Sequence, residues 1–332
     1  MSGALPLVIL GRMQRFGFVT ALWLVLGCDV GSATELETNA GSAGAAGSVA
    51  TTPTAGSSAT SAGSGSGTTA GGAASGGTNG SAAGAGTVTT PPKEEDFHLL
   101  FRDDFETLDA ARWQLMTHSW DGNISLFSTT AAKVADGNLT ISLTPAPEGT
   151  VDDQGKAKSF LGAEVRSLDT LTYGRVRARA KLAAGSAVVS SIVTIYTPWP
   201  ADNWNELDIE HLGFKPTDVQ FNTMVYTGPA LTPPVTTSVK PTDDPQIKAL
   251  GFDPSVDFHE YTIEWTPHSA RFLVDDVLLR EWNTRIDLMT LPQNVLLTIW
   301  ASGSPAWAGP VTEDTGKAVA VYDWVELYQF TP

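Results

Sequence analysis

Polar and apolar residues alternate with a period of two from about residue 94 to the end of the chain. In the clearest stretch a polar set alternates with an apolar one: Arg175, Arg177, Arg179 and Lys181 with Val176, Ala178, Ala180 and Leu182. This pattern is typical of a half-buried β-strand, because successive side chains point to opposite faces. Helical periodicity is almost absent, apart from a candidate turn at Leu108–Trp113. The pattern therefore restricts the domain to β architectures.

Further strand-like runs are separated by turn residues. They cover Leu99–Phe105, Asn138–Thr144, Ala187–Thr197, Glu206–Leu212, Val219–Tyr226, Phe258–Thr266, Arg271–Leu279, Val295–Trp300 and Ala318–Phe330. Inside one of these runs, Asp275-Asp276 lies between apolar flanks and predicts a tight hairpin turn. Many short strands joined by turns predict an all-β fold, an antiparallel sandwich.

The N-terminal residues form a different segment. Arg12 and Arg15 precede an apolar run, 16–27, that is shorter than the about 20 residues a spanning helix needs. This order predicts a signal peptide over residues 1–28, starting at Met1 or Met13. Its Val-Leu-Gly-Cys ending resembles the lipobox of bacterial lipoproteins, which implies acylation of Cys28 and anchoring at a bacterial cell envelope. The alternative is ordinary secretion with an incidental cysteine.

Residues 29–93 are rich in Gly, Ser, Ala and Thr, and no aromatic residue occurs between Gly31 and Pro92. Such a composition cannot bury enough apolar surface to fold, so it predicts a flexible, disordered linker. The folded domain is therefore expected to cover residues 94–332.

Charge and cysteine content exclude several classes of function. The chain has a formal net charge of −16, which argues against nucleic acid or an anionic membrane surface as a partner. Its single cysteine excludes an internal disulfide and a zinc site built from cysteines. We expect a monomer that meets a membrane only through a lipid on Cys28.

One predicted strand carries three acidic residues on a single face. Glu206, Asp208 and Glu210 alternate with Leu207 and Ile209, which point to the other face. Like charges held together raise at least one pKa, an arrangement that favours catalysis over stability. The alternative is a solvated acidic face on an exposed strand.

The spacing of the two glutamates can be tested against known mechanisms. Four residues at about 3.3 Å each separate their Cα atoms by about 13 Å, and their side chains can bring the carboxyls to about 5–6 Å. Retaining glycosidases hold their two carboxyls about 5–5.5 Å apart, whereas inverting enzymes need about 6.5–9.5 Å. The spacing therefore favours double displacement, with one glutamate as nucleophile and the other as acid and then base.

The stretch Trp204–Gly213 resembles the active-site strand of glycoside hydrolase family 16, in the Glu-x-Asp-x-Glu form typical of bacterial licheninases (endo-β-1,3-1,4-glucanases). Similar segments follow the family order from Leu99 to Phe330: Ala163–Arg166, Tyr173-Gly174, Val189–Ser191, Asp218–Asn222, Gly251–Asp253, Phe258–Tyr261, Glu264-Trp265, Val274-Asp275 and Tyr322–Val325. The resemblance implies a curved antiparallel jelly-roll sandwich, concanavalin-like, with a concave substrate cleft.

The resemblance also implies roles for individual residues. Glu206 matches the nucleophile, Asp208 the assisting carboxylate and Glu210 the general acid/base. The residues matching sugar-contacting positions are Trp204, Arg166, Asn222 and Glu164. Sugar rings have apolar faces that tryptophan can cover, so Trp120 and Trp307, in loop-like sequence, are further candidates for substrate binding. Trp265 and Trp324, inside alternating strands, are expected in the core.

Some features depart from the licheninase pattern or extend it. Met224 stands where a tyrosine is usual, and the proline-rich segment Thr227–Leu250 is longer than its licheninase counterpart.

The resemblance further implies a structural calcium ion held by Asp323 with backbone carbonyls of Asp104 and Gly137. Such oxygen ligands suit calcium. The alternative is that Asp323 only makes hydrogen bonds. No organic cofactor is expected.

Three functional hypotheses follow. The first is a retaining endo-glycosidase that hydrolyses mixed-linkage β-1,3-1,4-glucan at the envelope or outside the cell. The second is a β-1,3-glucanase or glucan transglycosylase of the same family, because water and a sugar hydroxyl compete for the same intermediate. The third is a non-catalytic glycan-binding module, which the presence of all three carboxyls disfavours.

Overall fold

Strands make up most of the regular structure in the computed structural model, which describes residues 91–197, 203–227 and 242–332. The predicted signal peptide with Cys28 and nearly all of the predicted linker lie outside the described residues. Helices within them are single turns: η1 (Glu94–Asp96), η2 (Thr129–Ala131), η3 (Ile286–Leu288), α1 (Pro305–Ala308) and η4 (Thr315–Lys317). None of these is long and apolar enough to cross a membrane.

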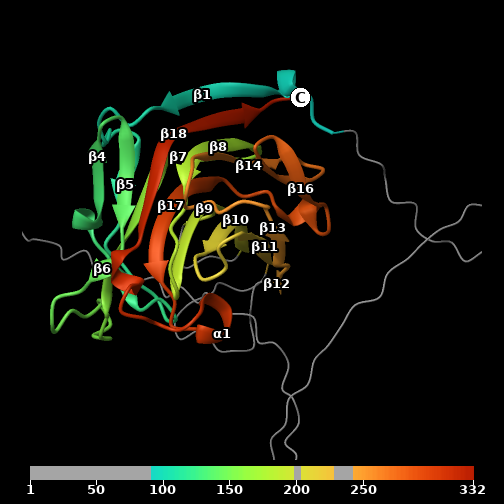
Figure 1. Cartoon of the computed structure of the whole chain (residues 1–332). Coiled ribbons are helices and arrows are strands. Elements are labelled where there is room, and N and C mark those ends of the chain that lie inside the picture. The colour runs from blue at the N-terminus through green and yellow to red at the C-terminus, as the bar shows by residue number, and fades with distance from the viewer. Residues whose placement is uncertain (1–90, 198–202, 228–241) are drawn as a thin grey trace, which may run out of the picture. The chain divides into compact units, whose positions relative to one another are not determined.

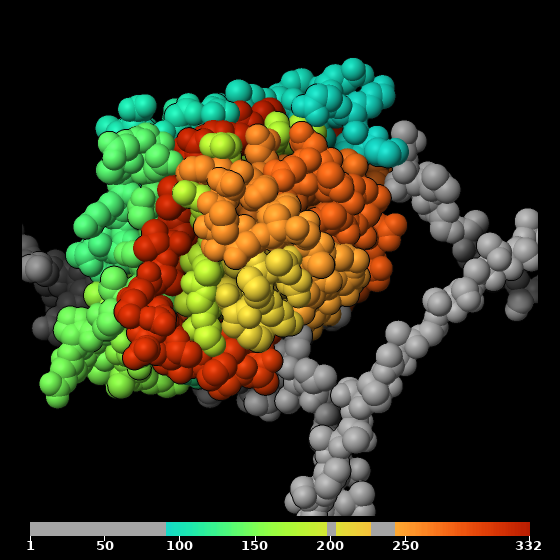
Figure 2. All heavy atoms as spheres, in the orientation of Figure 1, coloured from blue at the N-terminus to red at the C-terminus, as the bar shows by residue number. Residues whose placement is uncertain are grey.

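One of the two main sheets, here the outer sheet, has the order β16-β15-β14-β8-β18-β5-β4, with β1 also paired to β18. Its strands are β1 (Phe97–Asp103), β4 (Ala132–Ala135), β5 (Asn138–Ser142), β8 (Gly174–Lys181), β14 (His259–Trp265), β15 (Ala270–Val274), β16 (Val277–Trp282) and β18 (Val319–Phe330). All its pairs are antiparallel. Figures 1 and 2 both show β1, in cyan, along the edge of the domain beside the red β18.

The second sheet, here the cleft sheet, has the order β12-β11-β10-β9-β17-β7-β2. Its strands are β2 (Trp113–Leu115), β7 (Phe160–Leu171), β9 (Val188–Ile195), β10 (Asn203–Leu212), β11 (Asp218–Thr227), β12 (Thr242–Asp243) and β17 (Gln293–Ala301). Three short strands lie off this path: β3 (Ser125–Phe127) and β6 (Thr144–Pro145) pair with β7, and β13 (Gln246–Ala249) pairs with β11. Only β3 runs parallel to its partner.

The main core lies between these two sheets (Figure 1). Leu207 and Ile209 of β10 are fully buried in it, as are Tyr261 and Ile263 of β14 on the facing sheet. Alternation places these apolar side chains inward, and it places the polar side chains of β10 itself on the opposite face of the cleft sheet. The predicted antiparallel sandwich is confirmed, and Trp265 is part of its core as expected.

Two local predictions are also confirmed. Asp275 and Asp276 both have positive φ, 49° and 61°, as a tight two-residue hairpin between β15 and β16 requires. The candidate turn at Leu108–Trp113 is a single turn in which the Arg112 and Trp113 amides donate to the carbonyl of Asp109. Both features could be predicted from local sequence, because the residues that form each turn lie within a few positions of one another.

Candidate active site

Strand register sets the three acidic residues of β10 in three rows that cross the cleft sheet. Opposed residues of neighbouring strands point to the same face, so each row gathers side chains from several strands. The rows are Ile195–Glu206–Met224, Arg166–Leu296–Val193–Asp208–Asn222 and Glu164–Thr298–Ser191–Glu210–Gln220. Register therefore brings Glu164, Arg166 and Asn222, which lie far apart in the sequence, to the same face as the three acids.

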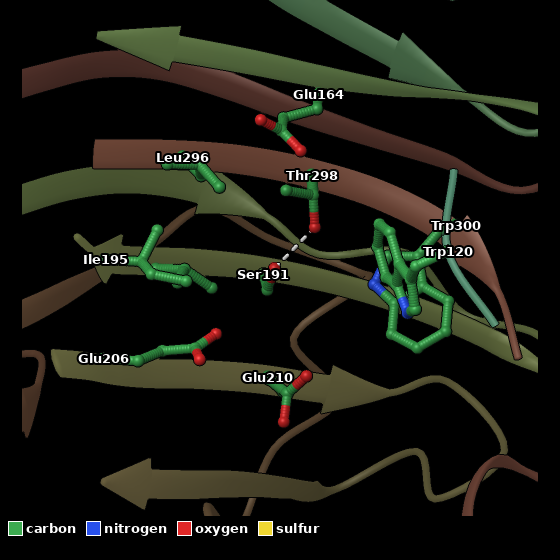
Figure 3. A pocket seen from close by; sticks show the side chains of 10 residues that line it. Trp120, Glu164, Ser191, Ile195, Glu206, Glu210, Leu296, Thr298 and Trp300 are labelled. Carbon is green, nitrogen blue, oxygen red and sulfur yellow. Dashed lines mark hydrogen bonds between the residues drawn. The ribbon is translucent and has the colours of Figure 1, made fainter. Parts of the chain in front are cut away.

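These rows form the floor of a pocket on the cleft sheet (Figure 3). Figure 3 shows Glu206 and Glu210 on one side, Glu164 across from them, the Trp120 and Trp300 rings along one wall, and aliphatic side chains along the other. The lining residues are Trp120, Glu164, Ser191, Val193, Ile195, Glu206, Glu210, Leu296, Thr298 and Trp300. The pocket thus combines the three carboxyls of Glu164, Glu206 and Glu210 with a flat aromatic wall, a combination suited to a sugar chain.

Glu206 is held by two neighbours on its own strand. The Trp204 indole Nε1 donates to Glu206 Oε2 at 2.6 Å, and a hydrogen bond also joins the carboxyls of Asp208 and Glu206. Burial raises the pKa of Glu206 to about 7, although both hydrogen bonds act to lower it. The carboxyl can therefore exist as the anion near neutral pH, as a nucleophile must.

Glu210 has a higher pKa than Glu206 and therefore keeps its proton to higher pH. Burial, followed by the charge of Glu206, raises its pKa to about 8, while the Gln220 amide Nε2 donates to Glu210 Oε2 at 2.9 Å and lowers it. Burial and both glutamates hold the pKa of Asp208 well above its ordinary value. Between the two pKa values, Glu206 can be ionised while Glu210 is protonated, which fits a nucleophile paired with a general acid.

The far side of the pocket carries a buried carboxyl with an arginine and a histidine beside it. Arg166 Nε donates to Glu164 Oε1 at 2.8 Å, and His118 Nε2 lies 3.6 Å from Glu164 Oε2. Burial lowers the pKa of His118, although the charge of Glu164 opposes this effect. Glu164 and Arg166 are thus fixed beside the pocket where sugar hydroxyls would need both acceptors and donors; sugar contact by either residue stays a prediction.

The three tryptophans proposed to bind sugar occupy different positions. Trp120 lines the pocket, with its ring 5.1 Å from that of Trp300. Trp204 is only 7 % exposed and packs among aliphatic side chains beside Glu206. Trp307, on α1, does not line the pocket; its ring lies 5.7 Å from Trp300 and its Nε1 donates to Gln220 Oε1 at 3.1 Å. Only Trp120 among these three presents a ring to the cavity.

Asn222 lies beside Asp208 and uses its amide oxygen within the protein. The backbone amides of Thr223 and Asp244 both donate to Asn222 Oδ1. Asp244 directly follows β12, in the described end of the long proline-rich segment; residues 228–241 of that segment lie outside the described residues. The hydrogen bond from Asp244 therefore links this end of the segment to the row that contains Asp208. The proposed sugar contact of Asn222 stays a prediction.

Several pocket residues were not predicted from the sequence. Ser191, Thr298, Val193, Ile195 and Leu296 lie on β9 and β17, where every residue is buried. Because every position of both strands is buried, their sequences lack the alternation of apolar and polar residues that would mark a cleft face. Only the register with β10 identifies them, and the hydrogen bond between the Ser191 and Thr298 hydroxyls, at 2.6 Å, confirms that they share a row.

The calcium prediction concerns a different region, on the outer sheet. The residue before Asp323, Tyr322, pairs with Leu139 of β5, and Gly137, just before that strand, lies near the Asp104 carbonyl. The Asp323 carboxylate, however, forms an ion pair with Arg179 of β8. No cluster of three or more His, Cys, Asp or Glu side chains suited to a metal occurs among the described residues. The ion stays a prediction, testable by thermal unfolding with and without calcium.

Comparisons with known proteins agree with this geometry. The sequence model described as "Glycosyl hydrolases family 16" matches residues 121–326. A beta-glucanase of Paenibacillus polymyxa is 31 % identical over 214 residues, covering 64 % of this chain and 77 % of that protein. A beta-glucanase of Fibrobacter succinogenes is 34 % identical over 182 residues, covering 53 % of this chain and 49 % of that protein, so the match spans about half of that relative.

Solved structures give the same result. A beta-1,3-1,4-glucanase (lichenase) from a mouse hindgut metagenome has 30 % identity and a TM-score of 0.58, covering 69 % of this chain and 98 % of that one. A Bacillus licheniformis beta-glucanase has 26 % identity and the same TM-score, covering 70 % of this chain and 98 % of that one. The predicted jelly-roll sandwich is thereby confirmed. Because the family match covers more than half of the chain and contains β10, we conclude that this enzyme belongs to glycosyl hydrolase family 16.

Proposed function

We propose that this protein is a retaining endo-glycosidase that hydrolyses β-glucan, specifically mixed-linkage β-1,3-1,4-glucan. The observation that carries the mechanism is the pair Glu206 and Glu210, which face one pocket from one strand with raised and different pKa values. The similarity to beta-glucanases, and to a lichenase at 30 % identity, supports the choice of substrate. The estimated carboxyl separation of about 5–6 Å supports retention over inversion.

In the first step the Glu206 carboxylate attacks the anomeric carbon of the sugar bound beside it. The glycosidic C–O bond breaks as the new C–O bond to Glu206 forms, and Glu210 transfers its proton to the departing oxygen. The products are a glycosyl ester on Glu206, the departing saccharide with a free hydroxyl group, and an ionised Glu210. Loss of the Glu206 negative charge lowers the repulsion that Glu210 then experiences.

In the second step Glu210 acts as the base. It removes a proton from water, whose oxygen attacks the anomeric carbon and displaces Glu206 as a carboxylate. The sugar leaves with its original anomeric configuration, and both glutamates return to their starting protonation states. The Trp204 N–H and the Asp208 carboxyl, both hydrogen-bonded to Glu206, stabilise the carboxylate as a leaving group.

The glucan chain is proposed to cross the strands of the cleft sheet. The pocket extends from β10 over β9 and β17 to Glu164 on β7. Trp120 and Trp300 offer a flat apolar wall to sugar rings, while Glu164 and Arg166 can accept from and donate to hydroxyls. Side chains of this kind orient a chain so that one glycosidic bond lies between Glu206 and Glu210.

Substitution of each glutamate tests the mechanism. Glu206→Gln is expected to reduce turnover of mixed-linkage glucan by at least about 1,000-fold while glucan binding is retained, because the amide fills the same space but cannot attack. Nuclear magnetic resonance of the first product should show retained anomeric configuration with the wild-type enzyme. Release of reducing sugar by Glu206→Gln at the wild-type rate, or an inverted product, would refute the mechanism.

A substrate panel tests the linkage. Lichenan, laminarin and xyloglucan are compared at equal mass concentration, with sizing of the products. We expect lichenan to be cleaved fastest and to short oligosaccharides. Faster cleavage of laminarin would instead assign a β-1,3-glucanase, and products longer than the substrate would assign a transglycosylase.

We also propose that a lipid on Cys28 holds the enzyme at a bacterial envelope, on the basis of the sequence Val25–Cys28 alone. The linker of residues 29–93 would then extend the domain away from the membrane. Expression in a bacterial host with a labelled fatty acid tests this. The wild-type chain should carry label and sediment with membranes, whereas Cys28→Ala should carry none; equal labelling of both would refute the anchor.

A further inference from the structure

Gln220 on β11 is the neutral partner of the proposed acid/base. It lies opposite Glu210 in the β10–β11 register and is 5 % exposed. Its Nε2 lies 2.9 Å from Glu210 Oε2 and donates to it. This side-chain hydrogen bond links the Glu210 carboxyl to the neighbouring strand β11.

A glutamine amide can make this contact in two ways. The oxygen and the NH2 group have nearly the same size, so rotation by half a turn exchanges a donor for an acceptor at the same place. With the NH2 group toward Glu210, the ionised carboxylate is stabilised; with the oxygen toward it, only the protonated form is favoured. The orientation of this amide therefore determines how readily Glu210 releases its proton.

Trp307 distinguishes the two orientations. Its Nε1 lies 3.1 Å from Gln220 Oε1. An indole N–H can donate but cannot accept, so Trp307 pairs with the amide oxygen and not with the NH2 group. The contact directs Oε1 toward α1 and Nε2 toward Glu210.

The support for Trp307 is itself fixed. Its ring packs against Trp300, and the next residue, Ala308, is buried with its carbonyl accepting from the Ala187 amide at 2.7 Å. Gly309 then turns the chain with φ 82°, and an added Cβ there would lie 2.5 Å from the Ser186 hydroxyl. This close packing leaves α1 little room to withdraw the indole from Gln220.

We propose that Trp307 is a positioning residue of this enzyme: its indole N–H orients the Gln220 amide so that an N–H donor always faces Glu210. This proposal rests on the proposed role of Glu210 as acid/base. In the first step the donor stabilises the carboxylate that forms as Glu210 gives its proton to the leaving oxygen. Without the indole, the amide can rotate and place its oxygen against that developing charge.

The other groups around Glu210 determine how this effect is measured. The charged or titratable neighbours are Glu206 and Asp208 on β10, and Glu164 across the pocket with its partners Arg166 and His118. The remaining side chains that face it from β9, β11, β17 and α1 are uncharged: Ser191, Gln220, Thr298 and Trp307. Removing the Trp307 N–H therefore changes no charge, and a shift in the pH profile reports on the amide.

The test compares two aryl β-glycosides of the same gluco-oligosaccharide. Phenol needs protonation to leave, whereas 2,4-dinitrophenol does not. Trp307→Phe, which retains a ring but lacks the N–H, is expected to lower kcat/KM on the phenyl substrate by about 10- to 100-fold and on the dinitrophenyl substrate by less than about 3-fold. The basic limb of its pH profile should move to higher pH, because the Glu210 carboxylate loses its donor.

Trp300→Phe is the matched control. Trp300 lines the pocket and packs beside Trp307, but its proposed role is sugar stacking. Its substitution should lower kcat/KM equally on the two substrates and leave the basic limb in place. Gln220→Met completes a double-mutant cycle: adding Trp307→Phe to it should cause no further loss, because the amide through which Trp307 acts is already gone.

Each outcome decides between a positioning role and simple packing. Equal losses on both substrates with Trp307→Phe, or additive losses with Gln220→Met, would overturn the proposal. If Trp307→Phe does not fold, benzothienylalanine at position 307 replaces the indole N–H by sulfur with the same shape, and the same comparisons apply. Glu210→Gln separates the two proposals. Wild-type activity of this variant on the phenyl substrate would refute the acid/base assignment itself. If Glu210→Gln is inactive but Trp307→Phe loses equal activity on both substrates, only the positioning role is refuted.

Discussion

Glu206 and Glu210 carry the same side chain on the same face of one strand, yet their partners differ. Glu206 receives the Trp204 indole and is joined to the Asp208 carboxyl, whereas Glu210 receives the Gln220 amide. Both carboxyls are raised by burial, to pKa values of about 7 and about 8. The difference between their proposed roles therefore comes from neighbouring residues, not from the acids themselves.

These pKa values predict a narrow pH optimum. The proposed mechanism needs Glu206 ionised and Glu210 protonated, so kcat/KM should rise with pH through about 7 and fall above about 8. Steady-state rates on a soluble β-glucan from pH 4 to 10 measure the two limbs. Glu95→Gln, at an exposed carboxyl on η1, should leave both unchanged. A broad plateau centred below pH 5 would contradict the prediction.

The same groups also affect folding. A carboxyl whose pKa rises from 4.5 to about 8 on folding favours the folded state at low pH, and this contribution is lost as pH rises through about 8. Glu210→Gln removes the ionisation, so it should raise the unfolding temperature at pH 8.5 by at least about 2–4 °C and change it little at pH 4. Thermal unfolding at the two pH values measures this, and equal effects at both would contradict it.

At the scale of elements, β10 is fixed from its buried side by Asn205. This side chain is fully buried; its Nδ2 donates to the Leu288 carbonyl at 2.9 Å, and its Oδ1 accepts from the Leu291 amide at 2.9 Å. The two bonds join β10 to the end of η3 and to the connection that leads into β17, the strand that supplies Thr298 and Trp300. β10 and the pocket wall are thereby held in one arrangement.

Removal of this link should affect both stability and activity. Asn205→Ala leaves the Leu288 carbonyl and the Leu291 amide, both of half-buried residues, without their side-chain partner, which costs about 2–4 kcal/mol of unfolding free energy. Chemical denaturation measures the loss. Asn138→Ala is the control, because Asn138 bonds only to a carbonyl two residues away in an exposed turn, and we expect less than about 1 kcal/mol there. Equal losses in the two variants would show that Asn205 does not join these elements.

The local sequence pattern predicted the strands and turns better than it predicted which strands lie next to each other. The alternation in β8 and β10 and the Asp275-Asp276 turn depend on a few adjacent residues, and all were correct. Pairing partners depend on contacts between distant segments, so Thr298 and Gln220 could not be placed in the row of Glu210 from the sequence. Trp307 was expected to bind sugar, but its N–H direction depends on α1, a single turn with no periodic signal.

At the scale of the domain, the first strand β1 pairs with the last strand β18 and lies along one edge of the outer sheet. The Phe97 and Phe330 rings lie 5.4 Å apart, and Glu94 forms an ion pair with Arg175 of β8. Asp103, at the end of β1, accepts from the Trp113 indole at 2.8 Å. The contacts that fix the first strand therefore begin at about residue 94, and the domain boundary at this residue stays a prediction.

Truncation tests this boundary. A chain that begins at residue 91 keeps all these contacts and should unfold at the same temperature as the full chain, with equal activity on soluble glucan. A chain that begins at residue 104 lacks β1, exposes an edge of β18 and loses the Trp113 partner, so its unfolding temperature should fall by more than about 5 °C. Calorimetry measures both. Similar unfolding temperatures for the two truncations would refute the role of β1.

The rows that cross the cleft sheet have a consequence for how specificity can change. Neighbouring strands lie about 4.8 Å apart, close to the length of one hexose unit in an extended polymer. A glucan that follows the proposed path would therefore meet a side chain from a new strand at each successive monomer. Exchange of Val193 on β9 or Leu296 on β17 would then alter contact with one monomer and leave the reacting acids on β10 in place. Such a surface allows selection, natural or in the laboratory, to adjust recognition of the polymer position by position without rebuilding the reaction centre.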